Sequence, residues 1–357
     1  MIVLDPSGFP KKGSDSCGVA RMWCGLLGKK DNCQIGVFLA YVSSKGHAPL
    51  VRRLYLPRDR ANDPVRREAC HVPEGVQYRK SWEIAADLLA RGGPVLPHGW
   101  VVGDDEFGRS SEFRALLRGR GERYVLDVPC NTTVRDLEVG PPARTSSRPG
   151  PRRRVPFVRA EAWAASLPAD RWTRLKVRDG AKGPVMVDAV AARVRARMGR
   201  RIGPEERLLV IRTPGAEPEV TYSMSNAAAD VGLIELVAAR SNRHRVERDF
   251  QEAKGEVKLA HHEVRSWVGW HHHVTLSLLA LWFLIGERRR IGGKTPAVTV
   301  CQVRALFTRL LRERPPTSGE IAREIRAVPR RNEEGRIYHW HARTKGYPPR
   351  RSTSGFS

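Results

Sequence analysis

The sequence predicts an α/β fold in which a mixed sheet is covered by helices. Runs rich in β-branched and aromatic residues alternate with helical segments as far as Val128, which is typical of such a fold. A change in composition near Gly140 then separates a strand-containing insertion from a helical C-terminal part. The 357 residues suffice for one large domain with an insertion, or for two smaller domains.

Short apolar runs mark the elements of the first part. Ile2 to Asp5 ends in an acid, and Pro6, Ser7 and Gly8 follow as a predicted turn. Further strands are expected at Gln34–Ser43, Leu50–Leu56, Trp100–Gly103 and Arg123–Val128. Helical spacing predicts helices at Trp82–Ala90, with Ser81 as N-cap, and at Ser111–Arg118.

The second part begins with Pro141–Pro156, which is rich in Pro and Arg and is expected to be a linker or an exposed basic loop. A helix is expected at Glu161–Leu167, with strands at Leu208–Arg212 and Val220–Met224. One helix should run from about Asp230 through Glu247. Leu276–Ile285 is expected to be a fully buried helix, Ile321–Val328 an amphipathic segment, and the basic tail frayed. We predict four parts: 1–139, 140–228, 229–290 and 291–357.

The charge balance points to a polyanionic partner. There are 63 Lys and Arg residues against 38 Asp and Glu, a net charge of +25. The longest apolar run is shorter than the ~20 residues of a membrane-spanning helix, and no signal peptide is visible. The six cysteines form no C-x-x-C pair, which favours a reduced cytosol over a zinc ribbon or a disulfide framework.

The segment from Arg243 to Lys254 places Glu247 between two cations on one helical face. Arg243 precedes Glu247 by one turn, and Lys254 follows it by two turns. An adjacent apolar stripe can anchor the helix in a core. A carboxylate flanked by cations is suited to metal-assisted cleavage of a nucleic acid. The other interpretation of this window alone is a solvated helix with i,i+4 ion pairs.

Two aspartates occupy similar positions at the ends of apolar runs. Asp5 closes IVLD and Asp104 closes VVGD. Together with a helical glutamate they would form an oxygen-rich site suited to Mg²⁺ or Mn²⁺. Each aspartate alone could equally be an N-cap or a turn residue.

Five stretches carry a resemblance to a known family: LDPSGFPKKG, GVARMWCGLLGKKDNCQIGV, LYLPRD, VVGDDEFGRSSEFRALL and VERDFQEAKGEVKLAHHEVRSWVGWHHHVTLSLLAL. They resemble a bacterial insertion-sequence transposase of the DDE superfamily, in the branch with a Tyr-Arg-Glu-Lys signature around the catalytic Glu. The resemblance implies that the catalytic, metal-binding residues are Asp5, Asp104 and Glu247, with Asp105 as the alternative to Asp104. It also implies that Arg243, Lys254 and Arg240 bind DNA phosphates, although Arg240 replaces the Tyr of the signature.

The same resemblance implies an RNase H-like core, a mixed five-stranded sheet with helices on both sides, and a strand-rich insertion before the catalytic glutamate. It implies two Mg²⁺ or Mn²⁺ ions, which would support cleavage at the ends of the element and strand transfer into target DNA. The implied partner is DNA, on which the protein would assemble as a homodimer. No interaction with a membrane is expected. The expected location is the bacterial cytoplasm, with the nucleoid.

Two alternatives stay open. The chain could be an inactive, DNA-binding relic of a transposase, or another RNase H-like nuclease such as a junction resolvase. Only four residues precede Asp5, too few for a full first strand plus a region that recognises element ends, so we expect a truncated or misassigned reading frame. In the insertion, Trp163 and Trp172 could stack an unpaired base, although core packing is the better interpretation.

Overall fold

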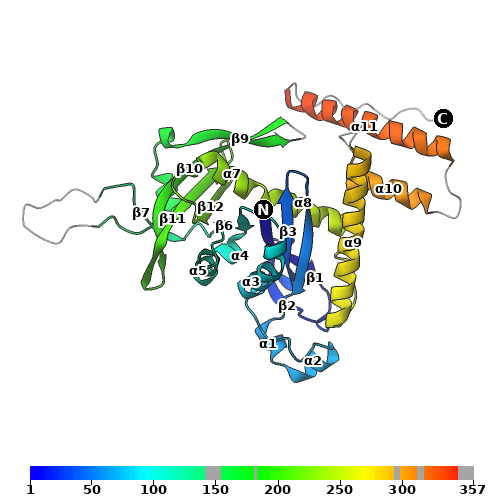
Figure 1. The fold of residues 1–357 in the computed structure, drawn as a ribbon, viewed down its shortest axis with the longest axis horizontal. Helices are drawn as coiled ribbons and strands as arrows, with labels where there is room; N and C mark the ends of the chain where they lie inside the picture. The colour runs from blue at the N-terminus through cyan, green and yellow to red at the C-terminus, as the bar shows by residue number, and fades with distance from the viewer. Residues whose placement is uncertain (141–153, 181–182, 293–297, 312–316, 345–357) are drawn as a thin grey trace, which may run out of the picture.

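The structure, a computed structural model, describes residues 1–140, 154–180, 183–292, 298–311 and 317–344. A mixed sheet of five strands forms its centre, in the order β4-β3-β1-β5-β6. Figure 1 shows β1 and β3 near the middle of the molecule. β1 is antiparallel to β3 and parallel to β5, and β6 is parallel to β5. This arrangement matches the RNase H-like core expected from the resemblance. The strands are β1 (Ile2–Pro10), β3 (Lys29–Ser43), β4 (Gly46–Leu54), β5 (Val101–Gly103) and β6 (Tyr124–Asp127).

The first strand is longer than the sequence predicts. A turn was expected at Pro6, but β1 continues to Pro10 and pairs with β3 along its whole length. β5 pairs only with residues Ile2 to Leu4 of β1, so on that side of β1 no strand of the described residues pairs with Pro6. Proline is tolerated at such an edge because it has no N–H to donate. Asp5 therefore lies within a nine-residue strand, and not at the end of a strand as the sequence predicts.

The insertion continues the same sheet. β12 (Val220–Ser225) pairs with β6 of the core, and β11 (Arg201–Arg212) and β10 (Gly183–Met198) follow outward. Within β10, alanine and valine alternate with arginine between Ala192 and Arg197, so one face is buried there. Because alanine and arginine are helix formers, no strand is predicted there from the sequence. The remaining strands are β2 (Ala20–Cys24), β7 (Thr133–Asp136), β8 (Val158–Arg159) and β9 (Thr173–Gly180).

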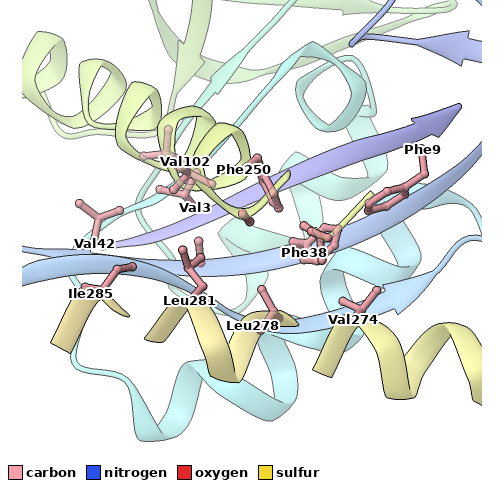
Figure 2. Packing of buried hydrophobic residues seen from close by; sticks show 14 of the residues in the cluster. Val3, Phe9, Phe38, Val42, Val102, Phe250, Val274, Leu278, Leu281 and Ile285 are labelled. Atoms are coloured by element: carbon pink, nitrogen blue, oxygen red, sulfur yellow. The ribbon is translucent and has the colours of Figure 1, made fainter. Parts of the chain in front are cut away.

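Helices cover both faces of the core sheet. One face packs against α3 (Ser81–Gly92), α4 (Asp105–Gly108) and α5 (Ser111–Gly119) through Ile2 and Leu4 of β1. The other face packs against α8 (Arg243–Glu256) and α9 (Trp267–Gly292) through Val3 and Phe38 (Figure 2). Alternate residues of β1 face opposite sides, so Asp5 lies on the same side as α8.

The C-terminal helices differ in two ways from the prediction. The single helix expected from Asp230 is two helices, α7 (Leu233–Ser241) and α8, which meet at Asn242. The helix α9 is longer than the predicted run and only partly buried, because Leu276 and Phe283 are exposed. By length and composition α9 could cross a membrane, but its other face belongs to the core.

The other helices lie at the periphery: α1 (Arg58–Ala61), α2 (Pro64–Ala69), α6 (Ala160–Ala165), α10 (Val300–Leu310) and α11 (Ser318–Thr344). The predicted amphipathic segment Ile321–Val328 forms part of α11. Most of the predicted linker, residues 141–153, and the basic tail from residue 345 lie outside the described residues. The division into four parts remains a prediction.

Candidate active site

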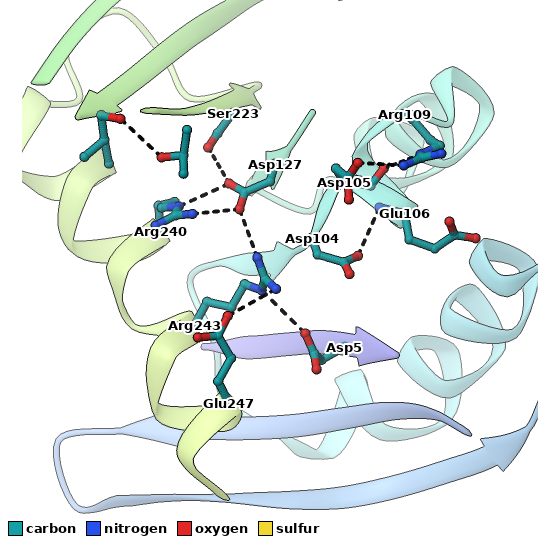
Figure 3. Close-up of polar contacts among 12 residues, drawn as sticks. Asp5, Asp104, Asp105, Glu106, Arg109, Asp127, Ser223, Arg240, Arg243 and Glu247 are labelled. Carbon is teal, nitrogen blue, oxygen red and sulfur yellow. Dashed lines mark hydrogen bonds and ion pairs between the residues drawn. The ribbon is translucent and has the colours of Figure 1, made fainter. Parts of the chain in front are cut away.

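Asp5 lies in the middle of the central strand, on the side of the sheet that faces α8 (Figure 3). Its side chain is 10% exposed, and its carboxylate lies 3.5 Å from Nε of Arg243. Burial raises the pKa of Asp5 to about 6, although the neighbouring Arg243 guanidinium lowers it. A further positive charge beside this carboxyl group would favour its ionised form.

Asp104 follows directly on β5, at the carboxyl end of a strand parallel to β1. Its Oδ1 accepts a hydrogen bond from the backbone N–H of Glu106 (3.1 Å), so it is the N-cap of α4. Burial raises the pKa of Asp104 well above its usual value, and the nearby carboxylate of Asp5 adds to this effect. Asp104 therefore fits both interpretations of the sequence: it is an N-cap, and it also lies beside Asp5.

Asp105 faces away from this cluster. Its carboxylate forms an ion pair with Arg109 one helical turn later (2.6 Å), and its side chain is 47% exposed. Figure 3 shows the Asp105–Arg109 pair apart from Asp5 and Arg243. The geometry therefore favours Asp104 over Asp105 as the partner of Asp5.

Glu247 extends from the second turn of α8 toward the same region. Val246 and Phe250 on the adjacent stripe are buried in the core and fix the helix, as the apolar pattern predicts. Arg243 lies between Glu247 and the sheet: its Nη2 is 3.2 Å from Glu247 Oε1. Burial alone would lower the pKa of Arg243, but the surrounding carboxylates of Asp5 and Asp127 outweigh burial and raise it. Arg243 is therefore a permanent cation among four carboxylates, since Asp104 also acts on it.

Asp127 is the residue of this cluster that was not predicted from the sequence. It is the last residue of β6, next to β5, and it is 8% exposed. Its Oδ2 lies 3.0 Å from Nη1 of Arg243, and its Oδ1 accepts a hydrogen bond from the Ser223 hydroxyl (2.6 Å). The signal was present, because YVLD at 124–127 repeats the pattern of IVLD at 2–5, an apolar run closed by an acid.

The two remaining predicted phosphate contacts have protein partners in this structure. Arg240 donates two hydrogen bonds to Asp127, of 3.2 and 3.0 Å. Lys254 donates to the carbonyl oxygen of Gly8 (3.1 Å), and its ammonium lies 5.4 Å from the ring centroid of Phe9. Burial lowers the pKa of Lys254. Arg240 thus lies beside Asp127, and Lys254 lies near Asp5.

The donor set fits a divalent metal in chemical type. Asp5, Asp104 and Glu247 offer only oxygen atoms, which Mg²⁺ and Mn²⁺ prefer, and two of these carboxyls are buried beside each other. Among the described residues no three acidic, His or Cys side chains are close enough together to hold a metal ion. Arg243, between Asp5 and Glu247, supplies the positive charge there.

The tryptophans of the insertion are packed within it. Trp163 is 5% exposed and its indole N–H donates to Asp136 (2.8 Å), so core packing is confirmed for this residue. Trp172 stacks under the guanidinium of Arg212, whose Cζ lies 3.9 Å from the ring centroid. The Trp163 ring is buried, and one face of the Trp172 ring is covered by Arg212.

Comparisons with known proteins agree with this geometry. A family model described as "DDE superfamily endonuclease" matches residues 1–184, more than half of the chain. A protein from Microchaete diplosiphon, described as "Probable transposase for insertion sequence element IS701", is 29% identical over 139 residues. This alignment covers 38% of the chain and 34% of the relative, so the chain matches about a third of that protein's length.

Proposed function

Because the chain belongs to the DDE superfamily endonucleases, we propose that it is the transposase of an insertion sequence. The observation that carries the proposal is the convergence of Asp5, Asp104 and Glu247 on Arg243, from two parallel strands and one helix. The basic composition suits a polyanionic substrate, and the partial similarity to a transposase adds support.

The proposed reaction consists of two displacements at phosphorus. In the first, the oxygen of water bonds to a phosphate at the element's end while the P–O3′ bond breaks, which leaves a 3′-hydroxyl and a 5′-phosphate. In the second, this hydroxyl bonds to a phosphate of target DNA and displaces its 3′-oxygen. The proton of each attacking oxygen is released as the new bond forms, and the displaced oxygen takes up a proton.

Asp5, Asp104 and Glu247 would hold divalent cations, Mg²⁺ or Mn²⁺, and two ions is the number we propose. When bound, such ions supply Lewis-acid stabilisation of the charge that builds on the phosphate. Arg243 would lie beside the reacting phosphate, where its permanent charge offsets the extra negative charge of the transition state. Lys254, whose ammonium borders the same cluster, and Arg240 would contact neighbouring phosphates.

The test is cleavage of DNA that carries the ends flanking the reading frame, with Mg²⁺ or Mn²⁺ added. Single Asp5→Asn, Asp104→Asn and Glu247→Gln variants should each lose about 100-fold or more in rate, as expected when a group stabilising transition-state charge is removed. Asn is as good an N-cap as Asp, so Asp104→Asn should leave α4 intact. Retained cleavage in one variant would remove that residue from the site.

Asp105→Asn is the matched control. It changes a neighbouring aspartate whose carboxylate pairs with Arg109, so the cleavage rate should stay at the wild-type value. Binding of the same DNA without divalent metal separates the alternatives. Wild-type protein that binds the ends but does not cleave them with either metal would be the inactive relic.

The proposal extends to partner and location. Joining two ends of one element requires two active sites, so we propose a homodimer assembled on DNA, in the bacterial cytoplasm with the nucleoid. Sedimentation with and without DNA that carries both ends would test the assembly. A protein that stays monomeric on such DNA would contradict it.

A further inference from the structure

A tryptophan on the β2–β3 hairpin is exposed although tryptophan is usually buried at least in part. Trp23 is 60% exposed, whereas the next residue, Cys24, is fully buried. A side chain at Gly8 of β1 would come within 2.9 Å of Cys24 Sγ, so the hairpin lies directly on the central strand. The indole of Trp23 is therefore presented to solvent from a fixed position.

Positive charges share the face of the hairpin that carries Trp23. Lys30 is directly opposite Trp23 in the antiparallel pair, and Arg21 is two residues before it on the same strand. Residues opposite each other and two apart lie on one face. Both cations are exposed, and neither makes an ion pair within the described part of the chain. An aromatic ring between free cations is the pattern that binds single-stranded nucleic acid.

Trp23 also forms part of the wall of a cavity of about 680 Å³ that reaches the candidate active site. The wall also includes Asp104 and, beside it, Asp105, Glu106 and Arg109, so the cavity and the carboxylate cluster share Asp104. A volume of this size is ordinary for a small-molecule site and suffices for one nucleotide. Other lining residues come from β1 and β3, and they include Pro6, Gly8, Met22 and Ile35.

We propose that the hairpin formed by β2 and β3 binds the DNA strand next to the cleaved phosphate, with an unpaired base stacked on Trp23. Arg21 and Lys30 contact the phosphates on either side of that base. Stacking is sequence-tolerant because every base has a π-face, whereas the cations carry the salt dependence. The inference rests on the proposed function for the identity of the DNA, but its test requires no cleavage.

The test compares two DNA substrates of equal length without divalent metal: a fully paired duplex and a forked duplex with unpaired bases at one end. Trp23→Ala should weaken binding of the forked DNA about 5- to 150-fold, the range of one lost base stack. It should leave binding of the paired duplex unchanged. Trp23→Phe, which keeps a ring, should recover most of the loss, and Val65→Ala, at another exposed apolar position, should bind like the wild type.

Arg21→Gln should reduce the slope of log affinity against log salt concentration by about 1 on both substrates.

Equal affinities of wild type and Trp23→Ala for the forked DNA would overturn the proposal, as would equal losses on both substrates. A change in oligomeric state of Trp23→Ala without DNA would also overturn it, because the hairpin would then be a protein contact. If only the role of Trp23 is wrong, the wild type still cleaves DNA in the presence of metal. If the wild type neither binds nor cleaves DNA, the proposed function is wrong as well. Thermal unfolding of each variant checks that it is folded.

Discussion

Arg243 and Asp127, which come from α8 and from the last core strand, form an ion pair of 3.0 Å beside the candidate active site. The same guanidinium also contacts Asp5 and Glu247, so one side chain joins the central strand, the edge of the core and the helix. Asp127 additionally holds Arg240 and accepts from Ser223 of the insertion. The position of Arg243 is thus set by a carboxylate that is not part of the predicted triad.

Asp127→Asn should lower the free energy of unfolding by about 3 kcal/mol, because two largely buried guanidinium groups lose their shared carboxylate. Adding Arg240→Gln should cost less than the sum of the two single changes, since the pair is already broken. Urea unfolding measures all three variants. Asp105→Asn, which breaks an exposed pair, should cost less than about 1 kcal/mol. Equal losses in Asp127→Asn and Asp105→Asn would show that Asp127 does not anchor Arg243.

Gly108→Ala should destabilise the protein by about 1–3 kcal/mol, the usual cost of overpacking. An added Cβ would collide with the backbone carbonyl oxygen of Asp127, so either α4 or the end of β6 has to shift. Both segments carry residues of the cluster, and cleavage should fall with stability. Gly119→Ala is the control, because nothing lies within 4 Å of the position that its added methyl group would take and alanine favours helix. A wild-type unfolding midpoint in Gly108→Ala would contradict the expected collision.

Mn²⁺ should stabilise the wild-type protein against unfolding, because a ligand that binds only the folded state adds stability by mass action. At 100 times its Kd the gain is about 2.7 kcal/mol. Asp5→Asn should remove most of this gain, since Asp5 is the buried carboxylate of the site. Asp105→Asn should retain it. The measurement is the unfolding midpoint as Mn²⁺ is added, and equal gains in wild type and Asp5→Asn would place the ion elsewhere.

Protonation of His262 should destabilise the protein as the pH falls from 6.5 to 4, whereas the raised pKa of Asp5 acts in the opposite direction. Burial lowers the pKa of His262 to about 4, and the nearby Lys11 and His273 lower it further. Below pH 6.5 the unfolded chain binds a proton that the folded chain does not, so stability present above that pH is lost on acidification. The loss from this residue alone is about 2 kcal/mol at pH 5.

His262→Gln should flatten this part of the pH dependence, because glutamine does not titrate and can still reach Gln34, which pairs with His262 at 3.0 Å. Urea unfolding at several pH values between 4 and 7.5 would measure the slope. His272→Gln, at an exposed position of α9, is the matched control. A slope in His262→Gln as steep as in the wild type would assign the acid sensitivity to other groups.

The core and the Glu247 helix could be predicted from the sequence because their patterns are local. Val246 and Phe250 repeat at helical spacing, and apolar runs mark the core strands. The rest depends on pairing between distant segments. Pro6 indicates a turn unless one knows that the pairing of β1 with β5 ends at Leu4. The Ala and Arg residues of β10 favour a helix, and only their pairing with β11 makes the segment a strand.

The candidate site could be predicted only in part, because it also depends on pairing between distant segments. The resemblance places Asp5, Asp104 and Glu247, and the structure brings them around Arg243. Asp127 closes an apolar run as Asp5 does, but only the parallel pairing of β6 with β5 shows that it reaches the site. Arg240 and Lys254 were predicted to bind phosphate, and that role stays a prediction because each has a protein partner in the DNA-free chain.

The continuity of the sheet from β6 into β12 has a mechanical consequence. Ser223 is paired with Asp127 across this junction through both backbone and side chain. A ladder of backbone hydrogen bonds resists shear far better than a flexible hinge does. A force on the outer strands of the insertion would therefore be transmitted to the ion pair between Asp127 and Arg243. The insertion and Arg243 are thus mechanically connected through Asp127.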